Sequence, residues 1–200
     1  FNLIALRFCI AFAVTAAVFH RQLRHPDKKA LAYGAALGAI IFAIFVALVA
    51  ALRISTVSEV GFLNSTSVVM VPLLCAAGQR KCPSRNVLAA MVIVLVGLLL
   101  MNLEHGLRFS SGALLCLLSA LLNSCAIILM DYASKRVDST VQLGIFQVGF
   151  SGVFALAASL LLESPTMPRT RLEWVAVLGL ALLCTAYGFI LRPVAQKYTT

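Results

Sequence analysis

Charged residues are scarce in this sequence. Lys, Arg, Asp and Glu together make up 12% of its 200 residues, whereas about 25% is usual in soluble domains. Hydrophobic residues reach 62% and the mean hydropathy is +1.00. Such a composition excludes a disordered chain, a disulfide scaffold and a water-soluble enzyme of ordinary type, and it predicts a polytopic membrane protein.

Motifs for metals, nucleotides and redox chemistry are also missing. The six cysteines show no CxxC spacing and no Cys/His cluster, and five of them fall within apolar stretches, where Cys packs as a small hydrophobic residue. The sequence contains no HExxH, no P-loop and no GxGxxG. We therefore expect no cofactor and no metal, and we do not expect an enzyme.

Seven long apolar stretches are present. They are rich in Leu, Ala, Val and Gly and lack the alternation of outer-membrane strands, so each predicts a membrane helix, for which about 20 apolar residues suffice. The expected fold is an all-α transmembrane bundle of seven helices. Their ranges are Phe1–Phe19, Ala30–Leu52, Val57–Ala77, Asn86–Leu103, Ala113–Met130, Val141–Leu162 and Trp174–Leu191.

Basic residues alternate from one connection to the next. The connections after the first, third, fifth and seventh stretches hold eleven of the 16 Lys and Arg residues, and the opposite set holds four. The positive-inside rule places the richer set in the cytoplasm. The net charge of +9 then marks topology, and we expect no nucleic-acid partner.

Two pairs of helices resemble each other. Ala51–Thr56 aligns with Ala195–Thr200, and a second alignment places Asn2 on Gln142 and Arg7 on Gln147. The charge rule gives the paired helices opposite directions, which is typical of the inverted repeats of secondary transporters. We expect a partial first repeat over residues 1–110 and a partial second repeat over residues 111–200.

Four stretches together resemble the EamA family of the drug/metabolite transporter superfamily. They are Leu6–Phe8, Thr56–Leu63 continuing to Val68–Leu74, Gly97–Leu100, and Thr185–Gly188 through Ala195–Thr199. The resemblance implies ten helices in two inverted repeats, so the seven stretches would be helices two to eight. One helix would then precede Phe1 and two would follow Thr200.

The resemblance also implies a function. It suggests a transporter of small metabolites or drugs, an exporter that works by alternating access in the bacterial inner membrane. The expected partners are a small-molecule substrate, the lipid bilayer and a second copy of the chain in a homodimer.

Arg7 is the one basic residue inside an apolar stretch. A buried cation needs a carboxylate, carbonyl oxygens or water. Glu59 is the expected partner by depth. Arg7 would either anchor an anionic group of the substrate or tie helices together through Glu59 or through backbone carbonyls.

Polar residues in three further stretches are candidates to line the cavity. Pro72 is expected to bend its helix, since proline leaves a carbonyl one turn back without its donor. The resemblance implies that the fourth, sixth and eighth helices face the cavity. The alternative is hydrogen bonding between helices. The candidates are Asn64, Ser67, Ser119, Asn123, Thr185 and Tyr187.

Two other functions stay open. Gly149–Gly152 resembles the GxSG helix of rhomboid intramembrane proteases, in which Ser151 would be the nucleophile. A serine nucleophile needs a histidine base from a later helix, but His20, His25 and His105 all precede Ser151. A small-residue face for helix packing explains the same motif. The third alternative is a membrane scaffold without transport.

Overall fold

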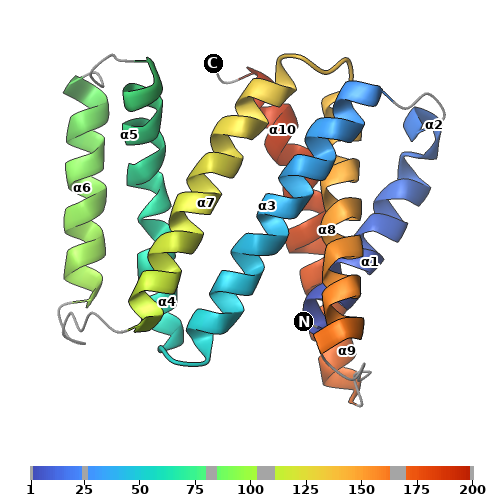
Figure 1. Cartoon of the computed structure of the whole chain (residues 1–200), viewed down its shortest axis with the longest axis horizontal. Helices are drawn as coiled ribbons and strands as arrows, with labels where there is room; N and C mark the ends of the chain where they lie inside the picture. Colours follow the sequence, from blue (N-terminus) through green and yellow to red (C-terminus); the bar gives the residue numbers. More distant parts are fainter. Residues whose placement is uncertain (1, 24–26, 80–84, 103–110, 163–169, 199–200) are drawn as a thin grey trace. The chain divides into compact units, whose positions relative to one another are not determined.

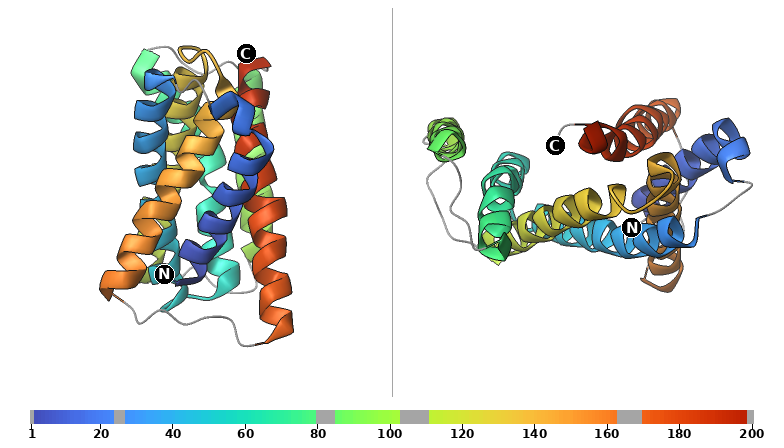
Figure 2. Two further views of the ribbon diagram at one scale, coloured as in Figure 1. Left: turned by 90° about the vertical axis from the view of Figure 1, so that its right-hand side faces the viewer. Right: turned by 90° about the horizontal axis from the view of Figure 1, so that it is seen from above.

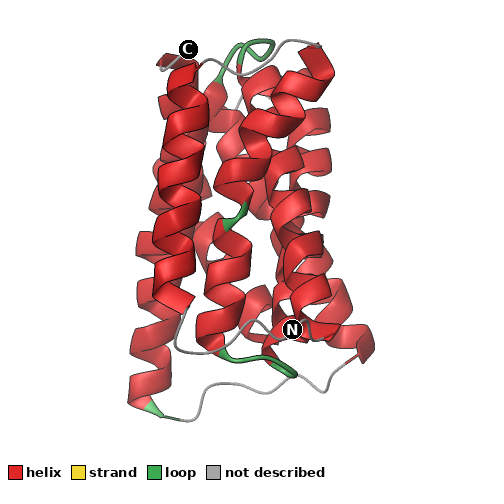
Figure 3. Ribbon diagram, turned by 90° about the vertical axis from the view of Figure 1, so that its left-hand side faces the viewer, coloured by secondary structure: helices red, strands yellow, loops and turns green. Residues whose placement is uncertain are grey.

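The computed structural model describes residues 2–23, 27–79, 85–102, 111–162 and 170–198, and these ranges contain helices and no strand (Figure 3). The long apolar stretches, rich in Leu and Ala and with Pro72 and Pro193 as the prolines inside the described helices, account for the helices. The elements are α1 (Asn2–Val18), α2 (His20–Leu23), α3 (Lys28–Leu52), α4 (Val57–Ser65), α5 (Ser67–Gln79), α6 (Arg85–Asn102), α7 (Ser111–Ser134), α8 (Thr140–Leu162), α9 (Arg171–Gly179), the π-helix η1 (Leu180–Tyr187) and α10 (Gly188–Tyr198).

Within the described ranges, five helical segments are long and apolar enough to cross a membrane, so the all-α class and the membrane character expected from the sequence are confirmed at this level. They are Lys28–Leu52, Val57–Ala76, Gly112–Ser134, Thr140–Leu161 and Glu173–Ala195. The first expected stretch forms α1, a shorter apolar helix of 17 residues, and the fourth forms α6, of 18 residues. The count of seven spans stays a prediction.

The chain separates into two compact units. Unit 1 comprises Phe1–Phe42 and Leu129–Thr200, and unit 2 comprises Ala43–Ile128. α3 and α7 each run through both units (Figure 1). These units follow contacts, whereas the expected repeats 1–110 and 111–200 follow sequence similarity, so the repeats stay a prediction.

Unit 1 is built around α8. Of its span residues 56% are buried, more than in any of the other four segments. α1 and α10 pack along it, as the side view shows (Figure 2). Gly34 and Gly38 of α3 let the α8 backbone approach so closely that a Cβ at either position would lie 2.6 Å from the Cβ of Phe146 or Phe150. This GxxxG pair is a typical helix-packing device in membranes.

Unit 2 contains α4, α5, α6 and parts of α3 and α7. Its core is a cluster of Ala51, Val60 and Cys116. Cys116 is fully buried, as a small hydrophobic residue would be. The cluster joins α3, α4 and α7 near the start of α4.

α4 and α9 begin with the same local device. The hydroxyls of Thr56 and Thr170 each accept a hydrogen bond of 3.3 Å, from the backbone N–H of Glu59 and Glu173 respectively. Each pair has the Thr-x-x-Glu spacing of a capping box, and the glutamate is also favoured by the helix dipole. The two helices therefore start where their sequences place a cap.

Two segments depart from a regular α-helix. The expected helix Val57–Ala77 is interrupted at Thr66, visible as a short green turn between two red helices in Figure 3, whereas Pro72 lies inside α5. The Thr66 N–H donates to the carbonyl of Leu63 at 3.2 Å, a bond to the third residue back, which tightens the turn. The second departure is η1, which joins α9 to α10 as one π-helical stretch.

Candidate functional site

Four of the expected cavity residues meet in unit 2. The Ser119 hydroxyl of α7 donates to Oδ1 of Asn64 at 2.9 Å, and Nδ2 of Asn123 donates to the Ser67 hydroxyl at 3.2 Å. We call Asn64, Ser67, Ser119 and Asn123 the polar seam. It joins α7 to the ends of α4 and α5 on either side of the turn at Thr66.

Among the described residues, the seam keeps hydrogen-bonding capacity that no partner uses. Asn64 is bonded through its oxygen and retains the donors of Nδ2, whereas Asn123 is bonded through Nδ2 and retains the acceptor Oδ1. Both amides are half-buried, while Ser67 and Ser119 are buried. The seam therefore presents one donor group and one acceptor group on a support that packing holds in place.

The helix interruption positions the seam. The Thr66 carbonyl accepts from the N–H groups of Val69 and Met70 at 3.0 and 3.1 Å. The Ser67 carbonyl accepts from the buried Ser124 hydroxyl of α7 at 3.3 Å. Irregular backbone at membrane depth is tolerated where protein or a cavity surrounds it, and here α7 supplies a side-chain donor.

Arg7 and Glu59 lie in different units. Arg7 is half-buried in α1, and its guanidinium carbon lies 5.3 Å from the ring centroid of Phe8, a cation–π distance. Glu59 is half-buried in the first turn of α4, where Thr56 caps the helix. The ion pair between Arg7 and Glu59 stays a prediction, and the capping box gives Glu59 a structural role of its own.

Thr185 and Tyr187 belong to η1 in unit 1. The Thr185 hydroxyl is fully buried and donates to the Leu180 carbonyl at 3.1 Å. This side-chain bond reaches an acceptor five residues back, so both of its partners lie within η1. Tyr187 is 67% exposed. Of the six candidate cavity residues, these two are the ones outside unit 2 and the seam.

A contact around Gln147 was not among the expected site features. Gln147 is fully buried in α8, and its Nε2 donates to the Phe189 carbonyl of α10 at 3.0 Å. Pro193, four residues after Phe189, has no N–H, so the Phe189 carbonyl lacks the usual α-helical donor. Gly144 allows the close approach, since a Cβ there would lie 3.0 Å from the same carbonyl oxygen. The signal in the sequence was a proline inside one apolar helix and a glutamine inside another.

The Gly149–Gly152 motif lies in a helix contact. The Ser151 hydroxyl is fully buried and bonds to the carbonyls of Gly38 and Gln147 at 3.1 and 2.8 Å. A Cβ added at Gly149 would lie 2.7 Å from the Phe12 ring of α1. Small residues here let α8 approach both α3 and α1.

The described residues hold no group of three or more His, Cys, Asp or Glu side chains that could bind a metal ion. His20 is exposed, and its ring nitrogen Nδ1 lies 3.1 Å from the Ala17 carbonyl. His25, His105 and Cys82 lie outside the described residues.

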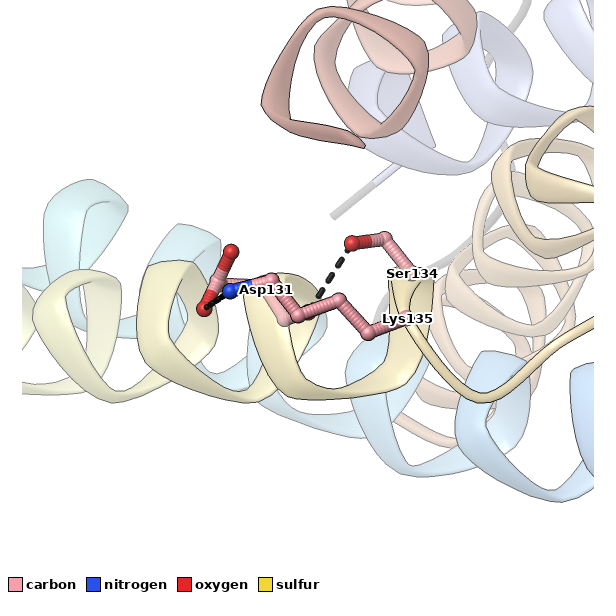
Figure 4. A network of polar contacts seen from close by, with 3 residues as sticks. All are labelled: Asp131, Ser134 and Lys135. Atoms are coloured by element: carbon pink, nitrogen blue, oxygen red, sulfur yellow. Dashed lines mark hydrogen bonds and ion pairs between the residues drawn. The ribbon is translucent and has the colours of Figure 1, made fainter. Parts of the chain in front are cut away.

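Both acidic and basic side chains lie at the end of unit 1 where α7 ends and α8 begins. Asp131 of α7 forms an exposed ion pair of 3.0 Å with Lys135, the residue after the helix ends, and the Ser134 hydroxyl donates to the Asp131 carbonyl at 2.9 Å (Figure 4). The Arg136 guanidinium lies 3.8 Å from the Tyr132 ring centroid. Lys135 and Arg136 therefore each contact a side chain of α7 close to them in the sequence.

Comparison with known proteins adds no family. No protein-family model matches this chain, and no curated protein is significantly similar to it.

Proposed function

We propose that this chain is a membrane transporter of small polar solutes, of the EamA type, and that the polar seam contributes to its solute site. The proposal is carried by one observation. A helix of an apolar, bilayer-length segment is interrupted at Thr66, and both sides of the interruption hydrogen-bond to polar side chains of α7. Interrupted helices that carry polar groups near mid-span are typical of transporter sites.

The chemistry of the seam suggests the class of solute. Asn64 offers amide donors and Asn123 an amide acceptor, with no charged side chain among the four seam residues. Paired amides suit a neutral or zwitterionic solute that both donates and accepts. By resemblance, the solute would be exported by alternating access, with one repeat moving against the other.

The proposal is tested by transport into proteoliposomes that contain the full chain, using a panel of radiolabelled amino acids, amides and polar metabolites. We expect saturable movement of at least one of them. Asn123→Ala should raise its KM or abolish transport, because the acceptor at Oδ1 is lost. Absence of transport across the whole panel, with protein correctly inserted, would contradict the proposal.

A matched control comes from α7 itself. Ser119 and Ser134 are both buried serines of this helix, but among the described residues the partner of the Ser134 hydroxyl is the Asp131 carbonyl of α7 itself. Ser119→Ala should change the transport KM and Ser134→Ala should not. Equal effects of both variants would assign the seam to helix packing and favour a scaffold.

The intramembrane protease is disfavoured by the partners of Ser151. A serine nucleophile needs a base within hydrogen-bond reach, but both recorded acceptors of this hydroxyl are backbone carbonyls, of Gly38 and Gln147. Peptide cleavage that Ser151→Ala abolishes would restore that alternative.

A further inference from the structure

An apolar groove lies on unit 1 between α1, α3 and α8. It has a volume of about 240 Å³ and is lined by Phe12, Leu31, Phe146, Gly149, Phe150 and Val153. Three of these side chains are open to the surroundings, with exposed fractions of 37% for Phe12, 42% for Leu31 and 61% for Val153. The groove contains none of the residues of the polar seam, which lies in unit 2.

The groove starts close to a basic end of the unit. Lys28 precedes Leu31 by three residues on α3, so both lie on one face, with about 4.5 Å of helix between them. Lys28 and Arg21 of α2 are exposed, and the described part of the chain records no ion pair for either. The nearby carboxylate of Asp27 accepts from the backbone N–H groups of Lys29 and Asp138 at 2.8 and 3.3 Å.

The depth of the groove matches one leaflet. Val153 lies thirteen residues after Thr140 at the start of α8, which corresponds to about 20 Å of helix. The groove therefore extends from about 5 to 20 Å below the basic end, whereas half of a hydrocarbon core is about 15 Å. Gln142 of α8 donates to the Gln22 carbonyl of α2 and accepts from the Asp27 N–H before α3, which brings these two segments together. An acyl chain in the groove would leave its headgroup beside Lys28 and Arg21.

We propose that this groove binds an acyl chain of an anionic phospholipid whose phosphate is held by Lys28 and Arg21. Basic residues at the end of an apolar groove between membrane helices are the arrangement that recognises such headgroups. The positive charge of the two bases selects anionic lipids, and the side chains of Phe12, Leu31 and Val153 contact the acyl chain. This proposal depends on the membrane character of the chain and not on transport.

The test is electron paramagnetic resonance of the full chain in phosphatidylcholine bilayers with spin-labelled phosphatidylglycerol or phosphatidylcholine. We expect a motionally restricted population that prefers phosphatidylglycerol, by about 5-fold for each base engaged. Lys28→Gln should lower this preference by about 5-fold, and Lys28→Gln combined with Arg21→Gln should abolish it, whereas Arg171→Gln, at the first residue of α9, should retain it. A preference that the Lys28→Gln, Arg21→Gln double variant leaves unchanged overturns the proposal, as does equal binding of the two lipids by the unaltered chain.

A second pair of variants tests the apolar part. Val153→Trp should fill the groove and lower the restricted population. Leu160→Trp, on the same helix and equally exposed at 62% against 61% for Val153, should not. Equal spectra for these two variants overturn the proposal, and so does a change of oligomeric state specific to Val153→Trp, because a second copy would then occupy the groove.

Discussion

Nε2 of Gln147 donates a 3.0 Å hydrogen bond to the Phe189 carbonyl, the acceptor that Pro193 leaves without the usual α-helical donor. A side chain from α8 thus repairs the hydrogen bonding of α10. The repair lies directly after the π-helical stretch η1. It connects the start of α10, next to the π-helical η1, to α8, the most buried of the five candidate membrane spans.

This relationship predicts coupling between Gln147 and Pro193. Gln147→Leu should lower the free energy of unfolding by about 1 kcal/mol, since a buried carbonyl loses its donor. In a Pro193→Ala background the loss should be smaller, because the new N–H can bond to the Phe189 carbonyl. The measurement is a double-mutant cycle of unfolding in mixed detergent micelles.

Pro193→Ala also leaves a cavity in the core. The single variant Pro193→Ala and the double variant with Gln147→Leu share this cavity, so its cost cancels in the cycle and the coupling energy remains. Ser159→Ala, at another buried polar position of α8, provides the control and should show no coupling to Pro193→Ala. A coupling energy of zero between Gln147 and Pro193 would disprove the repair.

The GxxxG contact predicts opposite effects for glycines that differ only in what surrounds them. Gly38→Ala should destabilise the chain by about 1–3 kcal/mol through overpacking, because its Cβ would lie 2.6 Å from the Phe150 Cβ. Gly97→Ala on α6, where nothing lies within 4 Å, should stabilise by about 0.5–1 kcal/mol through helix propensity. Thermal unfolding of both variants checks the signs, and a stable Gly38→Ala chain would contradict the close approach of α3 and α8.

The polar seam predicts a measurable pair energy. Asn64→Ala and Ser119→Ala should each destabilise the chain, and a double-mutant cycle should give a coupling of about 0.6 kcal/mol, the average for hydrogen bonds between membrane helices. Asn64 paired with Ser134→Ala should give none, since Ser134 bonds to Asp131 instead. The seam would be refuted as a contact if both cycles gave the same value.

Asp27 predicts a pH dependence of stability. The Lys29 backbone N–H, which donates to Oδ1 at 2.8 Å, lowers the pKa of the Asp27 carboxyl from its ordinary value, and the Asp138 backbone N–H acts in the same direction. A carboxyl whose pKa is lower in the folded state stabilises the fold above its unfolded pKa of about 3.9, and this stabilisation is lost as the pH falls through the folded value. The free energy of unfolding should therefore decrease below about pH 4.

Asp27→Asn should flatten part of this decrease in unfolding titrations between pH 7 and pH 2. Asp131→Asn serves as the matched control, because its carboxylate accepts from Lys135 Nζ rather than from backbone N–H groups. Identical pH profiles for Asp27→Asn and the unaltered chain would show that the loop contact adds no stability.

Much of the seam could be predicted from the sequence. Asn64 and Ser67 are three residues apart in the expected helix Val57–Ala77, and Ser119 and Asn123 are four apart in the expected helix Ala113–Met130, so each pair is predicted to share a face. Polar groups in apolar helices tend to face another helix or a cavity. That pattern identified both faces, but the partner of each atom depends on the height at which the two helices cross, which no local pattern contains.

Local sequence determined where helices form in this protein. Apolar length, the caps at Thr56 and Thr170 and the scarcity of charge act within a few residues of each position. Tertiary structure decided the turn at Thr66, the π-helical stretch and the Gln147–Phe189 bond. In an apolar medium, backbone groups outside regular helical bonding must be satisfied by whatever segment packs against them. The Phe189 carbonyl, which has Pro193 four residues on, takes its donor from Gln147, 42 residues away in the chain. The Ser67 carbonyl accepts from Ser124, 57 residues away, so only the packed structure could select either partner.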